Sequence, residues 1–363
     1  SPGAWILVAV ILVWLLNLFF VFRGVEKGIE RANKIFMPLL FAITIILIIR
    51  SAMLPGASVG IKKYLIPNFK KLLDGNVWKD AFSQIFFTLS LSFGIMIVYA
   101  SYLPKKTNLK RNAMLTAFIN CGFSIIVGFL VFSVMGYYAE QTGKTVAQAI
   151  GSGGPGMAFV TFPTAISKMG GLKEVFWIAF FLCLLFAGLS SSMSLFEAFT
   201  SSVKDKLGTS RTKATLITAG IGFILSILFA SRGAGINWLD AVDHAMTNYG
   251  LILTGIFNCI IIGWVYKAKV LRRHIFAVDG TKIGMWWEIC IKFFTPLVLT
   301  IIFIWGLIVT FRSKSSTYII IGWSWIVGMA IVSAVISNFE WKNKKALELG
   351  HHYEDEDNPL PYS

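Results

Sequence analysis

Charged residues are scarce in this sequence. Asp, Glu, Lys and Arg make up 14% of its 363 residues, whereas hydrophobic residues make up 56% and the mean hydropathy is +0.71. Soluble domains carry about 25% charged and about 45–50% apolar residues, so this composition excludes a soluble globular chain. Low charge and the lack of a glycine period also exclude disordered and collagen-like chains. Long apolar runs replace the alternation of barrel strands, which predicts an all-α polytopic membrane protein.

Cysteine is rare as well, and its positions exclude a disulfide framework. Cys121, Cys183, Cys259 and Cys290 all lie within apolar runs, which we interpret as four buried structural thiols. The sequence shows no nucleophile paired with a base and no phosphate-binding glycine loop after a strand. We therefore predict that the protein is not an enzyme.

The apolar runs are long enough to cross a membrane. We count nine candidate spans, each near the roughly 20 residues that a bilayer crossing needs. They cover Ala4–Val21, Ile35–Leu54, Val77–Leu103, Ala113–Tyr138, Val175–Val203, Ala214–Ala230, Trp238–Tyr266, Trp287–Phe311 and Tyr318–Ile336. The chain opens within a few residues of the first span and without an initiator Met, so we expect it to be a piece of a longer protein.

Basic residues account for the formal net charge of +15, and they gather between the spans. This placement is typical of cytoplasmic loops and argues against a nucleic-acid partner. Basic clusters at 23–34, 105–111, 204–213 and 267–273 follow alternate spans, which predicts a cell-membrane protein with a cytoplasmic C-terminus. The loop Pro55–Asn76, with four lysines on the opposite side, is the exception.

Three regions follow from this map. We predict a transmembrane transporter domain over residues 1–340, an outward lid-like loop over 139–173 and a cytoplasmic acidic tail over 341–363. The loop contains GSGGPGMAFVTFP, a stretch that we expect to interrupt any continuous helix. Loops of this length are more often functional than slack.

Polar residues inside the third and fifth spans have two interpretations. Ser90, Ser92 and Gly94 favour a broken helix whose backbone lines a cavity, or an intact helix with close small-residue packing. Ala187, Ser190 and Ser191 stand at i, i+3 and i+4, so two hydroxyls and a carbonyl could bind a hard monovalent cation. Small-residue packing is the alternative there too.

Other polar groups within spans are fewer. Asn120 and Ser124 share a face of the fourth span, where they could help to hold an anion or act as interhelical hydrogen-bonding groups. Ionisable groups within spans are Glu197, Asp240, Asp243, His244, Glu288 and Lys292. Asp240, Asp243 and His244 share a face, which indicates a metal site only weakly. Solvation or a gate charge explains them better, since they lie near the outer end of the seventh span.

Four motifs together resemble the neurotransmitter:sodium symporter family, in its bacterial amino-acid branch. They are GIERANKIFMP, SQIFFTLSLSFG, GPGMAF and LFAGLSSSMS, in the order and at the distances that the family shows. The resemblance covers essentially the whole chain. It implies an inverted-repeat fold with broken helices, of which this chain would be spans four to twelve, the first three being missing.

The resemblance also implies the ligands of the ions and of the substrate. Na+ and Cl- would be the bound ions, and the substrate an amino acid or a related small amine. The first sodium site would use Thr88 and Asn120, and the second Ala187, Ser190 and Ser191. The substrate site would use Phe87, Thr88, Ser90, Phe93, Ser191 and Leu195, and the chloride site Gln84, Thr88 and Ser124. Because Ser124 is neutral where chloride-independent members can carry an acid, chloride dependence is expected.

Gates follow from the same resemblance. Asp243 would be the acid of the outer gate, Asp205 the acid of the inner ion pair, and Tyr102 its support. Gly28 and Pro38 match a pair that lets a helix unwind. Two positions depart from the family pattern: Ser92 replaces a common Gly, and Asn258 stands where many members carry an acid.

The sequence therefore predicts sodium-coupled, chloride-dependent symport by alternating access. Its expected partners are a small-molecule substrate, membrane lipid and the missing N-terminal helices, in cis or in trans. A transporter-like sensor or an inactive partner subunit is the alternative function. A channel is disfavoured, since no ring of repeated carbonyl or charged motifs appears.

Overall fold

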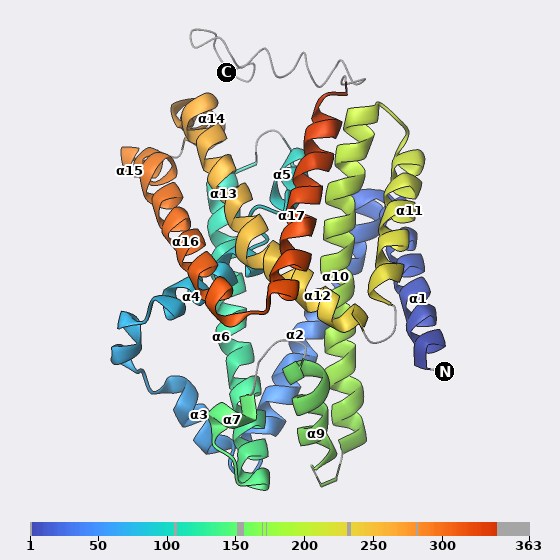
Figure 1. Cartoon of the computed structure of the whole chain (residues 1–363), viewed down its shortest axis with the longest axis vertical. Helices are drawn as coiled ribbons and strands as arrows, with labels where there is room; N and C mark the ends of the chain where they lie inside the picture. Colours follow the sequence, from blue (N-terminus) through green and yellow to red (C-terminus); the bar gives the residue numbers. More distant parts are fainter. Residues whose placement is uncertain are drawn as a thin grey trace. The chain divides into compact units, whose positions relative to one another are not determined.

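The computed structural model describes residues 2–104, 107–150, 156–168, 170–171, 173–230, 234–280 and 282–339. Every element of these ranges is helical, as predicted (Figure 1). The α-helices are α1 (Pro2–Phe22), α2 (Arg31–Ala52), α3 (Ala57–Leu65), α4 (Gly75–Thr88), α5 (Ile95–Ser101), α6 (Leu109–Thr142), α7 (Val146–Ile150), α9 (Phe162–Ser167), α10 (Lys173–Leu207), α11 (Arg211–Phe229), α12 (Ala234–Ala245), α13 (Leu251–Ile260), α14 (Ala268–Asp279), α15 (Met285–Ile289), α16 (Thr295–Ser313) and α17 (Ser316–Ser337).

Five short π-helical segments and one 3-10 helix complete the list. The π-helices are η1 (Val25–Glu30), η3 (Met157–Thr161), η4 (Met246–Gly250), η5 (Ile261–Val265) and η6 (Cys290–Phe294), and the 3-10 helix is η2 (Phe69–Leu73). Each π segment except η5 continues directly into an α-helix, and η5 is followed by a two-residue turn before α14. Single-turn π segments of this kind occur frequently at functional sites.

Eight helices of the described ranges are long and apolar enough to cross a membrane. They correspond to eight of the nine predicted spans, with ends that lie within a few residues of the prediction except at the start of the second. The predicted third span is the exception, because it is divided into α4 and α5. The broken-helix interpretation of this span is therefore confirmed.

Helix starts follow the local sequence. Asp74 precedes α4 and its side chain accepts a hydrogen bond from the Asn76 amide at 3.0 Å. Ser210 and Ser315 precede α11 and α17. Each hydroxyl accepts a hydrogen bond, at 3.4 Å, from the backbone amide of the residue three positions later. These side chains satisfy amides that have no partner within the helix, which fixes the start of each helix.

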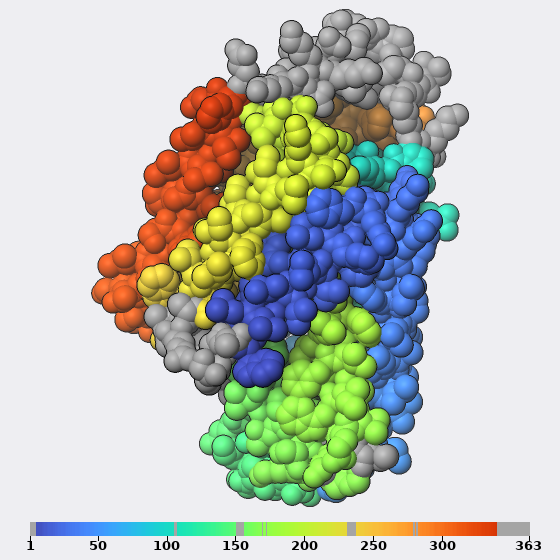
Figure 2. All heavy atoms as spheres, turned by 90° about the vertical axis from the view of Figure 1, so that its right-hand side faces the viewer, coloured from blue at the N-terminus to red at the C-terminus, as the bar shows by residue number. Residues whose placement is uncertain are grey.

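The chain folds into two compact units. Unit 1 contains residues 1–25, 72–115 and 193–363, and unit 2 contains residues 26–71 and 116–192. In unit 1, α1 packs against α11, α12 against α17, and α13 against α16. Figure 2 shows the surface formed by α1, in dark blue, and α11, in yellow. A small core of Ile252, Leu299 and Ile302 contacts Phe82 and Phe86 of α4.

Unit 2 has a larger apolar core. Its buried residues come from α2, α3, α6, α7, α9 and α10, and include Leu47, Val134, Met135, Val146, Phe162, Ile166 and Phe180. The rings of Phe162 and Phe180 stack with centroids 4.9 Å apart. Helix α3 approaches α6 so closely that a Cβ on Gly60 would lie 1.7 Å from the Phe132 carbonyl oxygen. Glycine at this position therefore sets the distance between the two helices.

Three predicted loops contain helix. Basic residues Lys27, Arg31 and Lys34 lie on η1 and α2, so the connection between the first two spans is only Arg23 and Gly24. The predicted loop 55–76 contains α3 and η2, and 139–173 contains α7, η3 and α9. These helices are short and depend on packing, which periodicity alone does not reveal. Residues 105–106, 151–155 and 341–363 lie outside the described residues.

Candidate functional site

The backbone between α4 and α5 is irregular. The last hydrogen bond at the end of α4 is donated by the Leu91 amide to the Phe86 carbonyl, at 2.9 Å. The first of α5 is donated by the Val98 amide to the Gly94 carbonyl, at 3.0 Å. Between them Ser90, Ser92 and Gly94 all have positive φ, of 52°, 67° and 78°. Two serines in this conformation are strained, since their Cβ atoms crowd the backbone.

A neighbouring glycine makes room for Ser92. A Cβ on Gly255 of α13 would lie 2.9 Å from the Phe86 ring and 3.1 Å from the Ser92 hydroxyl. Ser92, which departs from the Gly common in the family, therefore fits here because Gly255 of α13 has no side chain at this contact. Strain kept by the surrounding structure often marks a functional position.

The predicted substrate residues of unit 1 gather around this interruption. Phe87 and Phe93 lie on either side of it, with ring centroids 6.0 Å apart in an edge-to-face arrangement. Thr88 is the last residue of α4, and Ser90 follows within the interruption. Leu195 belongs to the same unit, on α10, whereas Ser191, one turn earlier on that helix, belongs to unit 2.

The predicted second sodium site lies on one face of α10, in unit 2. The Ser190 hydroxyl donates to the Ala187 carbonyl at 2.9 Å, and Ser190 is buried while Ser191 is exposed. Hydroxyl and carbonyl oxygens are the hard ligands that a monovalent cation prefers. Coordination of Na+ by Ala187, Ser190 and Ser191 stays a prediction.

Residues predicted for the first sodium site and the chloride site are divided between the units. Gln84 and Thr88 lie in unit 1, and Asn120 and Ser124 lie on α6 in unit 2. Within unit 2 the Ser124 hydroxyl donates to the Asn120 carbonyl at 3.0 Å. The approach of Thr88 to Asn120 and Ser124 stays a prediction.

A buried carboxylate joins four elements of unit 1. Glu197 of α10 is completely buried, and Arg211, the first residue of α11, donates two hydrogen bonds to it, one at 3.0 Å. The Tyr102 hydroxyl, at the end of α5, donates to the same carboxylate at 2.9 Å. Arg211 also donates to the Val21 carbonyl of α1, at 2.9 and 3.2 Å. One acid therefore holds α1, α5 and α11 to α10.

The sequence does not predict this network, because Arg211 follows the fifth span within a cluster of basic loop residues. The signal is Glu197 itself, since an acid within an apolar run needs a partner. Tyr102, predicted to support an ion pair of Asp205, instead contacts Glu197. Asp205 is partly buried on α10, and in the part of the chain that the structure describes no basic side chain forms an ion pair with it.

The predicted outer-gate acid belongs to a polar cluster on α12 and α17. Asp240 accepts the Tyr318 hydroxyl at 2.9 Å, and the His244 and Tyr318 rings lie 5.7 Å apart. Asp243 is exposed on the same helix. No group of three or more His, Cys, Asp or Glu residues that could hold a metal occurs among the described residues. Asp240, Asp243 and His244 thus do not form such a group.

Gly28 and Pro38 lie on the first long helical segment of unit 2. Gly28 is buried within the π-helix η1, and Pro38 lies inside α2 without ending it. A π-helical turn has one more residue per hydrogen bond than an α-helix, so the backbone around Gly28 is already irregular. Unwinding of this segment stays a prediction.

Comparison with known proteins gives this geometry a context. The family model described as the sodium:neurotransmitter symporter family matches residues 3–341. An uncharacterized sodium-dependent transporter of Methanocaldococcus jannaschii is 41% identical over 335 residues, which cover 91% of this chain and 68% of the relative.

Two animal proteins are similar over the same part of the chain. The human sodium- and chloride-dependent neutral and basic amino acid transporter B(0+) is 32% identical, over 90% of this chain and 53% of the relative. The Drosophila melanogaster sodium-dependent serotonin transporter is 33% identical, over 87% of this chain and 51% of the relative. The chain thus spans about half the length of these animal relatives.

Proposed function

The chain belongs to the sodium:neurotransmitter symporter family, and on that premise we propose that the protein containing it takes up an amino acid or a related small amine together with Na+. Members of this family are multi-pass membrane transporters and not enzymes. The proposed mechanism is alternating access, in which the sodium gradient drives uptake. Ion and substrate would favour each other's binding because they organise the same groups.

The observation that carries this proposal is the interrupted helix in the third span. Its ends expose peptide dipoles and backbone groups that must find partners inside the membrane. Phe87 and Phe93 bracket the interruption with apolar surface, while Thr88 and Ser90 add hydroxyls. An apolar pocket with a few polar groups suits a small zwitterion or amine. Ser191 and Leu195 of α10 would complete this pocket.

Two sodium ions are proposed as coupled substrates. The first would be bound by Thr88 and Asn120, and the second by Ala187, Ser190 and Ser191. Support for the second comes from the convergence of the Ser190 hydroxyl and the Ala187 carbonyl on one face of α10. Hydroxyl and carbonyl oxygens are the hard ligands that such a cation prefers.

Chloride is proposed as a further bound ion. Gln84, Thr88 and Ser124 would hold it with one amide and two hydroxyls. The names of several relatives, including the human amino acid transporter, describe chloride-dependent transport. The neutral Ser124 is compatible with a bound anion, because no fixed carboxylate at that position would repel it.

Gating is proposed to involve three acids. Asp243 would close the outer side, and Asp205 and the Glu197 network would close the inner side, which we place in the cytoplasm with the C-terminus. Tyr102 would act through Glu197, its hydrogen-bond partner. Gly28 and Pro38 would let the adjacent helix unwind on the inner side, while residues 139–173 would form an outer lid.

The test is uptake of labelled amino acids into proteoliposomes, in sodium against choline. We would compare this chain alone with the natural full-length protein, whose preceding helices would act in cis or could be added in trans. Accumulation by the full-length protein in sodium but not in choline would support the proposal. Absence of uptake of every common amino acid by both proteins would favour a sensor or an inactive partner subunit. Transport by this chain alone would contradict the proposed need for preceding helices.

A further inference from the structure

Helix α14 is amphipathic and too short to cross a membrane. Its 12 residues extend about 18 Å, which is little more than half of a bilayer core. Ala268 and Ile275 are buried, whereas Lys269, Arg273 and Phe276 are exposed. These three residues stand at i, i+4 and i+7, so they form one outward stripe of two basic side chains and one aromatic ring. We call this stripe the α14 face.

A neighbouring ion pair fixes the direction in which the α14 face points. The Arg272 guanidinium contacts the Glu288 carboxylate of α15 at 2.9 Å, and both side chains are largely buried. This contact attaches α14 to α15. Among the described residues, no acidic side chain forms an ion pair with Lys269 or Arg273. The positive charge of the face is therefore directed outward.

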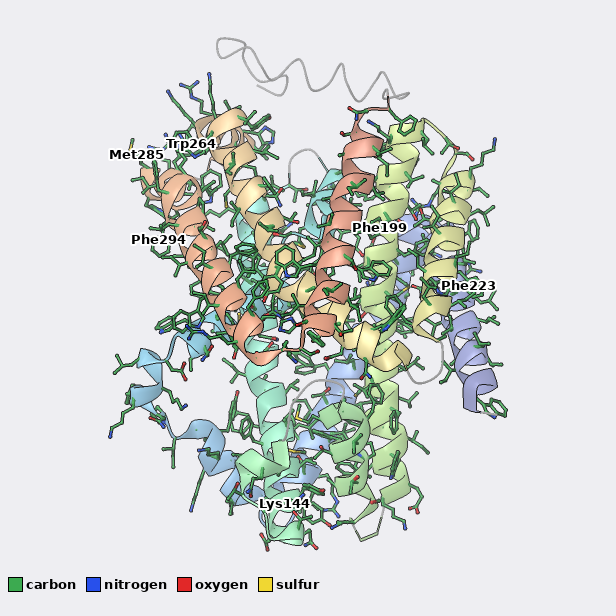
Figure 3. The ribbon with its side chains drawn as sticks, viewed as in Figure 1. Lys144, Phe199, Phe223, Trp264, Met285 and Phe294 are labelled. Atoms are coloured by element: carbon green, nitrogen blue, oxygen red, sulfur yellow. The ribbon has the colours of Figure 1, made fainter. Side chains whose placement is uncertain are left out.

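Exposed aromatic side chains lie beside this face. Trp264 is 56% exposed and Trp286 is 64% exposed, at the end of η5 and in α15. The Trp264 indole contacts the Phe293 ring edge-on at 5.4 Å and donates to the Lys292 carbonyl at 3.4 Å. Figure 3 shows Trp264 and Met285 at the same end of these helices, where α14 also lies. Tryptophan gathers at the boundary between lipid and water.

We propose that the α14 face binds the headgroups of anionic phospholipids, with the helix lying along the membrane boundary. Lys269 and Arg273 would contact phosphate groups, and Phe276 would enter the acyl region beside Trp286. Basic clusters next to membrane spans are attracted to negatively charged leaflets. An acidic protein segment would match the charge but would leave Phe276 and the two tryptophans in water. This inference is independent of the transported substrate.

The test measures lipid binding to the full-length protein in detergent by native mass spectrometry. Phosphatidylglycerol and phosphatidylcholine would be titrated separately, with wild type, Lys269→Gln/Arg273→Gln and the control Lys62→Gln/Lys63→Gln. The control removes the same charge from exposed lysines of α3 in the other unit. Each basic side chain near a membrane surface contributes about fivefold, so the α14 variant should weaken phosphatidylglycerol binding by tenfold or more.

Two results would overturn the proposal. The first is equal phosphatidylglycerol affinity for the α14 variant and the control, with phosphatidylcholine binding unchanged in both. The second concerns the acidic stretch Glu354–Asp357 of the tail. If deletion of residues 346–363 abolishes the difference in phosphatidylglycerol affinity between wild type and the α14 variant, the face binds the tail and not lipid. An unchanged thermal midpoint in both variants would establish that folding is intact.

Discussion

Gly94 and Gly122 differ in backbone conformation although both leave open space for a methyl group. Gly94 has φ of +78° at the start of α5, and Gly122 lies inside α6. Alanine in a left-handed conformation costs about 1–2 kcal/mol, so Gly94→Ala should lower the thermal midpoint of the purified protein. Gly122→Ala should leave it unchanged or raise it. Equal changes of the thermal midpoint in Gly94→Ala and Gly122→Ala would show that the positive φ of Gly94 adds no strain to an alanine.

Ser124 is the residue on which the chloride proposal depends. A carboxylate at this position would supply a fixed negative charge in place of the anion, so Ser124→Glu should make uptake independent of chloride. Ser124→Gln has a similar size and no charge, and it should keep the chloride dependence. Uptake measured in chloride against gluconate separates the two. Persistent chloride dependence in Ser124→Glu would remove Ser124 from the anion site.

Helices α3 and α6 illustrate how one small residue sets the packing of two elements. A Cβ on Gly60 would overlap the backbone carbonyl of Phe132, which cannot rotate away as a side chain can. Gly60→Ala should therefore separate the helices and greatly reduce the yield of folded protein. Gly188 of α10, in the same unit, has no atom within 4 Å of its Cβ position. Gly188→Ala is the matched control, and a normal yield of Gly60→Ala by size-exclusion chromatography would contradict the packing argument.

The carboxylate of Glu197 connects elements that are distant in sequence. Glu197→Gln should destabilise unit 1 strongly, since breaking a buried pair costs about 3–5 kcal/mol. The double variant Glu197→Gln/Arg211→Gln should recover part of this loss, because neither partner then keeps an unpaired charge. Glu30→Gln, in the exposed pair of Glu30 with Lys34, should change the thermal midpoint little. If the loss of stability in the double variant equals the sum of the losses in the two single variants, Glu197 and Arg211 are not energetically coupled.

Sodium binding should stabilise the whole full-length protein, because a ligand that binds only the folded state raises its apparent stability. The thermal midpoint should therefore be higher in sodium chloride than in choline chloride. Ser191→Ala should reduce this difference by removing one oxygen ligand. Ser202, three turns later on α10, donates to the Ala198 carbonyl of its own helix, and Ser202→Ala should keep the full difference. An undiminished sodium effect in Ser191→Ala would remove Ser191 from the second sodium site.

The extent of the spans is predictable from sequence, whereas their long-range contacts are not. Apolar length is a local property, so α10 and α17 begin and end within a few residues of the predicted spans. The break after Thr88 is one of two interpretations of Ser90, Ser92 and Gly94, because the same residues also suit an intact helix with close packing. The pairing of Glu197 with Arg211 depends on how α10 and α11 pack, and no local pattern contains that information. The short helices α3, α7 and α9 are missed for the same reason.

The burial of Glu197 has a consequence for biosynthesis. Ribosomes add about 5–20 residues per second, so the 14 residues that separate Glu197 from Arg211 take about one to three seconds to emerge. During that interval α10 carries an uncompensated carboxylate, and a charged side chain in an inserting helix costs up to roughly 2.5–3.5 kcal/mol, the value for the helix centre. Helices α10 and α11 should therefore leave the translocon as a hairpin, with the ion pair formed before either helix meets lipid.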